Sequence, residues 1–147
     1  MGKIIEVSHE KLKDLTNLAL ELYSGNIYEG LYRELEQMLN EKKHQFLLYM
    51  EEEQPVAFIH LSIRSDYVEG SDSSPTGYLE GIFVKQAYRR QGISTELFNC
   101  GKKWLKEQGC TQIGSDMEID NQDSYPFHMS LGFKEAGRLI TFIRDLS

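Results

Sequence analysis

Hydrophobic residues recur along this chain with two periods, and the change of period outlines its elements. A short apolar run over 3–7 predicts a first strand, and Ser8 then fits the N-cap of a helix. Two helices are predicted on either side of a Ser-Gly-Asn break at 24–26. Their apolar positions at helical spacing are Leu12, Leu15, Ala19 and Leu22 in the first helix, and Leu31, Leu35, Met38 and Leu39 in the second.

The period then falls to two, which indicates strands. Residues 45–50 and 56–63 read as a hairpin, in which Ala57, Ile59, Leu61 and Ile63 share one face. After a polar loop over 64–77, residues 78–84 predict a further strand that contains a glycine, Gly81. A glycine inside a strand marks a bulge or the close approach of another backbone or a ligand.

The last third predicts another alternation of helix and strand. A helix begins at about Gly92 and stops at Gly109, and residues 111–116 form a strand. A further helix covers 121–131, and Pro126 either lies in its first turn or marks its start. The tail, LITFIRDL at 139–146, reads as a final strand. The order predicts one α/β domain over residues 1–147, with a central mixed, twisted sheet flanked by helices.

Composition narrows the class of protein. The net charge of −7 argues against nucleic acid or an anionic membrane as a partner and is compatible with a cationic small molecule. No apolar run approaches the roughly 20 residues that span a bilayer, and the N-terminus has no signal-peptide core, so we expect a cytoplasmic protein. Cys100 and Cys110 lack the spacing of a metal site, and we expect them to be reduced and no metal to be bound.

The stretch YRRQGIST, residues 88–95, carries the first candidate chemistry. It joins a strand to a helix, and the first amides of a helix have no intrahelical partner, so they favour anions. A pyrophosphate could therefore be held by the side chains of Arg89 and Arg90 and by the first helical amides, those of Ile93, Ser94 and Thr95. The alternative is an ordinary helix start with solvated arginines. Neither a Walker loop nor a GxGxxG fingerprint is present.

The longer stretch LEGIFVKQAYRRQGIS, residues 79–94, resembles the acyl-CoA-binding motif of the GCN5-related N-acetyltransferases. That motif is a bulged strand followed by R/Q-x-x-G-x-G/A; Arg89, Gln91 and Gly92 match it, and Ser94 replaces the last small residue. The order of elements also matches, so the resemblance covers nearly the whole chain. It implies the acetyltransferase fold and acetyl-CoA as co-substrate.

Three further stretches are similar to the aminoglycoside 6'-N-acetyltransferases: residues 62–84, GSD at 114–116 and HMSLGF at 128–133. This resemblance implies acetyl transfer to the 6'-amine of an aminoglycoside, a cationic small molecule, and commonly a homodimer. Two alternatives stay open. The acceptor could be another amine, such as a polyamine, an amino acid or a protein, or the chain could bind acyl-CoA without catalysis.

The reaction needs a base, because the amine must be neutral when it attacks the thioester. Asp116 and Glu80 stand at the ends of neighbouring strands, and the resemblance assigns to them the contact with the amine; either could accept the proton, directly or through water. The amide of Val84 is the expected oxyanion donor by the same resemblance. His128 takes the position of the family's tyrosine acid, with Tyr125 as a second candidate, although a merely packed histidine is equally consistent.

The remaining candidate residues fall into two groups. The CoA-binding set is Ile82, Phe83, Val84, Arg89, Arg90, Gln91, Gly92, Ile93, Ser94, Thr95, Asn121, Ser124 and His128. The substrate-binding set is Tyr23, Asp66, Tyr67, Glu69, Glu80, Asp116, Glu118 and Asp120, to which Asp72 adds one more acid.

The acidic members of the substrate set could form a cleft for a polycation, with Asp116, Glu118 and Asp120 on one side of a continuing strand. The same three residues superficially resemble a calcium loop, but Asn121 and Phe127 stand where that loop needs glycine and glutamate. Tyr23 and a second tyrosine, Tyr28, flank the break between the first two helices. They could close over the substrate or belong to the core.

Overall fold

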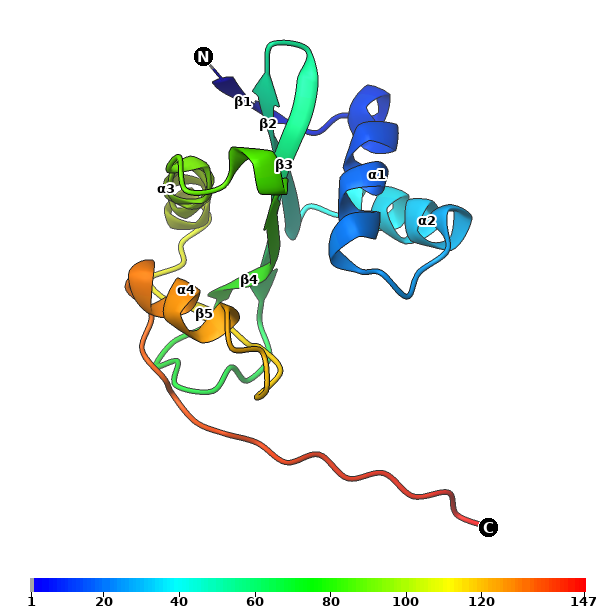
Figure 1. The fold of residues 1–147 in the computed structure, drawn as a ribbon. Coiled ribbons are helices and arrows are strands. Elements are labelled where there is room, and N and C mark those ends of the chain that lie inside the picture. Colours follow the sequence, from blue (N-terminus) through cyan, green and yellow to red (C-terminus); the bar gives the residue numbers. More distant parts are fainter. Residues whose placement is uncertain (1) are drawn as a thin grey trace.

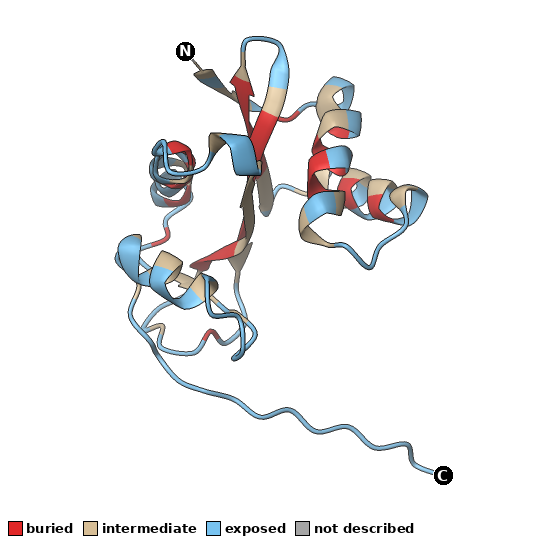
Figure 2. Cartoon of the chain, in the orientation of Figure 1, coloured by how far each residue is buried: buried red, intermediate tan, exposed pale blue. Residues whose placement is uncertain are grey.

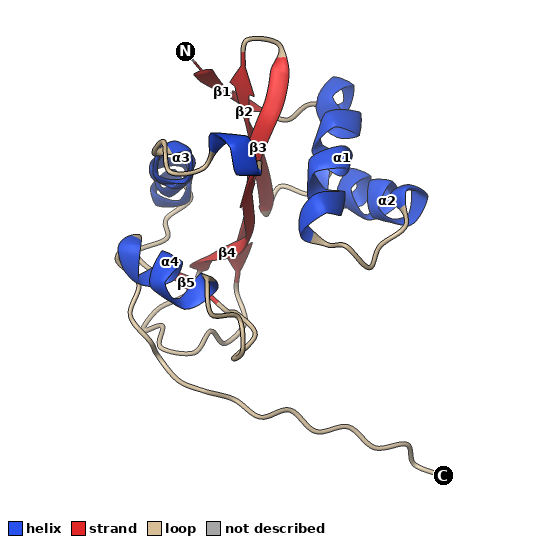
Figure 3. Cartoon of the chain, in the orientation of Figure 1, coloured by secondary structure: helices blue, strands red, loops and turns tan. Residues whose placement is uncertain are grey.

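The computed structural model describes residues 2–147, which fold around one mixed sheet (Figures 1 and 3). Its five strands are β1 (Gly2–Glu6), β2 (His44–Glu51), β3 (Gln54–Arg64), β4 (Thr76–Val84) and β5 (Ile113–Ser115). They lie in chain order, antiparallel from β1 to β4, whereas β5 pairs parallel to β4.

Helices cover both faces of this sheet. They are α1 (Leu12–Leu22), which continues a 3₁₀ turn at His9–Lys11, then α2 (Tyr28–Leu39), α3 (Ile93–Glu107) and α4 (Ser124–Ser130). Helices α1 and α2 lie on one face and α3 on the other (Figure 1). A second 3₁₀ turn, Gln86–Tyr88, connects β4 to α3.

The alternation of side chains along β3 explains how one strand serves two cores. Ile59 and Leu61 pack in the cluster that contains the buried face of α3. Phe58, between Ala57 and Ile59, packs with α1 and α2 in the other cluster. Both clusters are buried (Figure 2), and the face predicted from the period of two at 57–63 is confirmed.

Strand β4 carries the predicted irregularity. Leu79 pairs with Leu61 and Gly81 with His60, so Glu80 is an extra residue with no opposite partner. This is a β-bulge, which bends a strand and redirects a side chain. Gly81 is also a point of close approach, because an added Cβ would lie 2.2 Å from the hydroxyl oxygen of Tyr23.

Three predicted elements differ from the structure. Strand β5 is shorter than 111–116 and ends before Asp116, and α4 begins at Ser124 rather than 121 because the Asn121 side chain accepts a hydrogen bond from the Ser124 amide. The final strand at 139–146 is wrong for the single chain. These residues are extended but unpaired (Figure 1), and a strand requires a neighbouring strand for its backbone hydrogen bonds.

Within residues 2–147, no helix combines the length and apolar content needed to cross a membrane. The same part of the chain contains no cluster of His, Cys, Asp and Glu side chains with the geometry of a metal site.

Candidate active site

Two carboxylates meet where strands β4 and β5 separate. The strands pair over Gly77–Leu79 and Ile113–Ser115. Glu80 is the next residue of β4 after the paired segment, and Asp116 is the first residue after the end of β5. Tyr23, at the end of α1, has a raised pKa because of its burial and because of the negative charges of Glu80 and Asp116. The structure thus brings together three residues that the sequence predicted for the site.

Glu80 is held on both of its oxygens. Arg64 Nη2 donates to Oε1 and Oε2 at 3.0 Å each, and Arg64 Nε donates to Oε2 at 3.2 Å. The Ser62 hydroxyl donates to Oε2 at 2.5 Å. Ser62 and Arg64 alternate along β3, so both side chains reach the same face as the bulged Glu80.

Asp116 has a different environment. It is exposed. Within residues 2–147 it accepts one hydrogen bond, which the Tyr78 hydroxyl donates to Oδ2 over 2.5 Å. Burial and this bond to a carboxylate raise the pKa of Tyr78, so the phenol stays protonated and donates. The Arg64 guanidinium stacks on the Tyr78 ring, 3.4 Å from its centroid.

Sequence reasoning missed Ser62, Arg64 and Tyr78. A signal was available, since Ser62 and Arg64 are polar residues on the strand face opposite Leu61 and Ile63. Only the pairing of β3 with β4 shows that they meet Glu80.

The backbone of Val84 points in the direction expected of an oxyanion donor. The Lys85 amide donates to Val56 O on β3 at 2.9 Å. Because amides alternate in direction along a strand, the Val84 and Ile82 amides point to the opposite edge, which β5 leaves uncovered beyond Leu79.

The stretch 88–95 folds as the sequence predicted at its glycine. Gly92 adopts φ 82°, in the left-handed region that glycine reaches without strain, and caps α3. The first intrahelical bond runs from the Glu96 amide to Gly92 O at 3.0 Å, so the amides of Ile93, Ser94 and Thr95 precede the helical ladder. These amides can receive an anion.

The two arginines of this stretch differ. Arg89 turns back onto β4, where its Nε donates to Val84 O at 2.7 Å and its guanidinium lies 5.7 Å from the Phe83 ring centroid. Arg90 is exposed, with a left-handed φ of 63°. Gln91 Nε2 makes a long contact of 3.5 Å with Ala87 O.

His128 joins α4 to β5. Its Nδ1 lies 2.8 Å from Ser124 O, and its Nε2 lies 2.8 Å from the Ser115 hydroxyl. The ring also makes an edge-on contact with Phe133. Both ring nitrogens therefore have protein partners, which fits a packed histidine; the acid role stays a prediction. Ser124 and Asn121 make the turn that starts α4, whereas Tyr125 is exposed.

The acidic substrate set is only partly assembled. Glu118 and Asp120 are exposed in the loop after β5. Their predicted alternation with Asp116 fails because the strand ends at Ser115. The Tyr67 hydroxyl donates to Glu69 in the exposed loop after β3.

Within the described residues, no hydrogen bond, ion pair or ring contact joins Asp66, Asp72 or Tyr28 to the carboxylate pair. Asp66 is exposed, and Asp72 is tied to Gln112, whose Oε1 accepts from the Asp72 amide at 2.8 Å. Tyr28 stacks on Tyr32, 5.9 Å between ring centroids, within α2.

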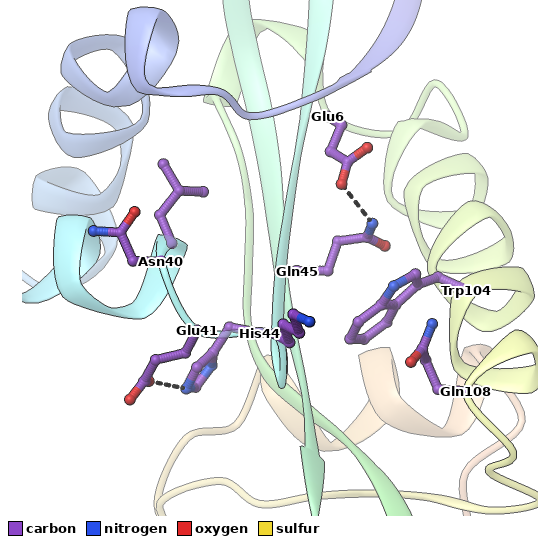
Figure 4. A pocket seen from close by; sticks show the side chains of 9 residues that line it. Glu6, Asn40, Glu41, His44, Gln45, Trp104 and Gln108 are labelled. Carbon is purple, nitrogen blue, oxygen red and sulfur yellow. Dashed lines mark hydrogen bonds and ion pairs between the residues drawn. The ribbon is translucent and has the colours of Figure 1, made fainter.

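Two shallow hollows lie away from these residues. One, of about 360 Å³, lies beside the start of β2 (Figure 4). It is lined by Glu6, Leu39, Asn40, Glu41, Lys42, His44, Gln45, Trp104 and Gln108. The other, of about 400 Å³, lies between α1 and α2. Apart from Tyr28, which borders the second hollow, neither is lined by a predicted site residue, and the candidate catalytic residues lie where β4 and β5 separate.

Comparison with known proteins places this geometry in a family. Residues 12–133 match the model of the acetyltransferase (GNAT) family. Aminoglycoside N(6')-acetyltransferase type 1 of Acinetobacter haemolyticus is 38% identical over 139 residues, which are 95% of each chain. The protein of that name from Serratia marcescens is 33% identical over 97% of this chain and 99% of its own.

Solved structures agree with the sequence comparison. The aminoglycoside antibiotic 6'-N-acetyltransferase AAC(6')-Ih from Acinetobacter baumannii has a TM-score of 0.93 at 34% identity and covers 100% of both chains. AAC(6')-Iy, solved in complex with the bisubstrate analogue CoA-S-monomethyl-acetylneamine, has a TM-score of 0.93 at 30% identity over 99% of both chains. The bulged strand, the glycine-capped helix and these similarities together show that this chain belongs to the acetyltransferase (GNAT) family.

Proposed function

We propose that this protein transfers the acetyl group of acetyl-CoA to the 6'-amine of an aminoglycoside, as a single cytoplasmic domain over residues 1–147. The observation that carries the proposal is the pair Glu80 and Asp116 at the separation of β4 and β5, on a chain similar along its length to aminoglycoside 6'-N-acetyltransferases. The pair offers negative charge and a proton acceptor where an ammonium group would have to lose its proton.

The reaction proceeds by direct attack. Asp116 or Glu80 accepts a proton from the ammonium group, directly or through water, and the neutral nitrogen attacks the thioester carbon. The Val84 amide stabilises the resulting oxyanion, and a preorganised donor of this kind contributes roughly 3 kcal/mol. The C–S bond then breaks, the nitrogen loses its second proton to water, and the amide product forms. The CoA thiolate leaves and takes a proton from His128, Tyr125 or water.

Acetyl-CoA binds along the uncovered edge of β4 and the start of α3. The amides of Ile93, Ser94 and Thr95 face the pyrophosphate, and the exposed Arg90 adds positive charge. Gly92, which has no atom within 4 Å of an added Cβ position, lets the phosphates approach the backbone. Asn121 and Ser124 lie at the start of α4, where they contact the CoA arm.

The substrate is a polycation, and the loop acids supply the opposite charge. Asp66, Glu69, Glu118 and Asp120 are exposed. A hydrogen bond to a charged group is worth about 1.5–3 kcal/mol when desolvated, but exposed pairs contribute much less. We therefore assign most of the recognition to Glu80, Asp116 and Tyr23, with the 81% exposed Tyr67 packing on a sugar ring.

The test mixes purified protein with acetyl-CoA and kanamycin A and follows thiol release with a thiol-reactive dye. The matched control substrate is an aminoglycoside with a hydroxyl at the 6' position. We expect release with kanamycin A only. If neither compound causes thiol release although acetyl-CoA binds measurably, the aminoglycoside is not the acceptor. The protein would then acetylate another amine or bind acyl-CoA without catalysis. Failure to bind acetyl-CoA would refute the proposed role of residues 88–95.

We further propose that the chain is a homodimer in which the tail of one copy pairs with the sheet of the other. The tail leads away from the body (Figures 1 and 2). Leu139, Ile140, Phe142, Ile143 and Leu146 are each at least 78% exposed. So much apolar surface in one short segment favours burial against a partner, and an extended segment finds its missing hydrogen bonds at a sheet edge.

Light scattering after size exclusion tests this arrangement. The full chain should have twice the monomer mass, and a variant with Phe142→Ser and Ile143→Ser should shift toward the monomer. A full chain that stays monomeric at high micromolar concentration would contradict the dimer. As a control, Arg33→Gln on the exposed side of α2 should leave the mass unchanged.

A further inference from the structure

We infer that Arg64 is a positioning residue of the acetyl transfer, which holds Glu80 as a fixed anion and so leaves Asp116 as the proton acceptor. The inference rests on the proposed function and deepens it, because it divides between the two carboxylates the roles that the reaction leaves open.

The first argument is that both carboxylate oxygens of Glu80 already accept hydrogen bonds. Both of its oxygens accept from Arg64, and Oε2 also accepts from Ser62. A carboxylate engaged by a forked guanidinium is held in a fixed direction. Because both oxygens of Glu80 already accept hydrogen bonds from these donors, Glu80 is suited to orient the amine electrostatically and poorly suited to accept its proton.

The second argument is the availability of Asp116. The Tyr78 hydroxyl bonds Oδ2, and in residues 2–147 no further hydrogen-bond donor reaches this side chain. Asp116 is exposed, whereas Glu80 is only 22% exposed. The free oxygen of Asp116 can therefore take the ammonium proton and become a carboxylic acid, while the nitrogen keeps the electron pair that forms the N–C bond.

The third argument is that Arg64 contacts both Glu80 and Tyr78, the residue that holds Asp116. Its guanidinium edge binds Glu80 and its face lies 3.4 Å from the Tyr78 centroid, and Tyr78 in turn fixes Asp116. One planar side chain thus sets the position of both carboxylates. Lysine cannot reproduce this arrangement, because an ammonium group neither forks nor stacks in the same way.

Positioning and simple charge predict changes in different kinetic constants. The aminoglycoside is a polycation, so removing the positive charge of Arg64 would strengthen its binding if charge alone mattered. A misplaced carboxylate pair instead slows the chemical step, and small displacements in an active site cost up to about 100-fold in rate. We therefore expect Arg64→Gln to lower kcat roughly 10- to 100-fold while KM for kanamycin A stays level or falls.

The experiment measures steady-state acetylation of kanamycin A by the full chain at saturating acetyl-CoA. The variants are Arg64→Gln, Arg64→Lys, Glu80→Gln, the double variant Arg64→Gln/Glu80→Gln, and Asp116→Asn. Arg33→Gln on α2 is the matched control and should keep wild-type kinetics. Thermal unfolding of each variant establishes that it is folded at the assay temperature.

Three results are expected together. Arg64→Lys recovers only part of kcat. In the Glu80→Gln background, Arg64→Gln lowers kcat by a smaller factor than in the wild type, because the contact with Glu80 is already altered and only the path through Tyr78 to Asp116 remains. For Asp116→Asn, kcat/KM rises with pH as the amine loses its proton in solution, whereas Arg64→Gln keeps the shape of the wild-type pH profile.

Two other outcomes separate the proposals. If the wild type acetylates kanamycin A and Arg64→Gln keeps kcat within about twofold, or if the Arg64 and Glu80 effects are fully additive, the positioning role is refuted and the proposed function stands. If the wild type acetylates no aminoglycoside, the proposed function itself fails, and the division of roles fails with it.

Discussion

His60 should make the stability of this protein sensitive to mild acid. It lies on β3, is 7% exposed and stacks on Phe46 with 4.1 Å between ring centroids. Its Nε2 lies 2.9 Å from Nδ1 of His44. Burial and then the neighbouring His44 lower the pKa of His60 from 6.5 to about 3. The native ring is therefore neutral over the range in which an unfolded histidine becomes charged.

The sign and size of the effect follow from the two pKa values. Between pH 6.5 and 3, His60 is protonated in the unfolded chain but neutral in the native chain. The free energy of unfolding therefore decreases as the pH falls below 6.5. Integrating the linkage from pH 7 to pH 5 gives a loss of about 2 kcal/mol. His44, whose pKa burial also lowers, adds to the loss in the same direction. For a chain of this size, 2 kcal/mol corresponds to a decrease in Tm of about 4–8 °C.

Urea unfolding of the wild type and of His60→Gln at pH 7, 6 and 5 checks the magnitude. Glutamine can still bond to His44 but does not titrate. We expect His60→Gln to be less stable at pH 7, where it loses the ring stack, and to lose about 2 kcal/mol less than the wild type on going to pH 5. Parallel stability curves for the two proteins would refute the reasoning, because every other titrating group is common to both.

Three further predictions concern packing and the site. Tyr78→Phe removes the hydroxyl that donates to Asp116. We expect kcat for kanamycin A to fall about tenfold while the free energy of unfolding stays near that of the wild type. Unchanged kinetics would contradict a role for this hydrogen bond. Gly101→Ala places a Cβ 2.1 Å from Leu61 Cδ1 in the core, so urea unfolding should show a loss of about 1–3 kcal/mol. Gly81→Ala would meet the hydroxyl of Tyr23, which lies at the end of a flexible side chain. Calorimetry should therefore show a smaller loss of about 1 kcal/mol, and the kinetic assay a reduced kcat/KM.

Local physics made much of the fold predictable from the sequence. The apolar period of two at 57–63 predicts a strand with one buried face, and in the structure that face packs against α3. Gly92 starts α3 because glycine tolerates the left-handed conformation found there. The bulge at Glu80 was likewise expected from a glycine inside a strand, whereas the approach of the Tyr23 side chain to Gly81 was not.

The candidate residues Glu80, on β4, and Asp116, just after β5, were also indicated by the sequence, since the family resemblance marks both of them. Their partners were not. Ser62, Arg64 and Tyr78 reach the carboxylates only through the register of β3 with β4, and register depends on residues far apart in sequence.

The sequence by itself determined the periods, the caps and the motif, because each depends on residues within a few positions of one another. Tertiary structure decided which polar side chains meet, because contacts such as Ser115 with His128 require two elements to dock. It also decided the fate of the tail. Residues 139–146 have the apolar and β-branched content of a strand, but a strand exists only when a second one supplies its hydrogen bonds, and the single chain offers the tail none.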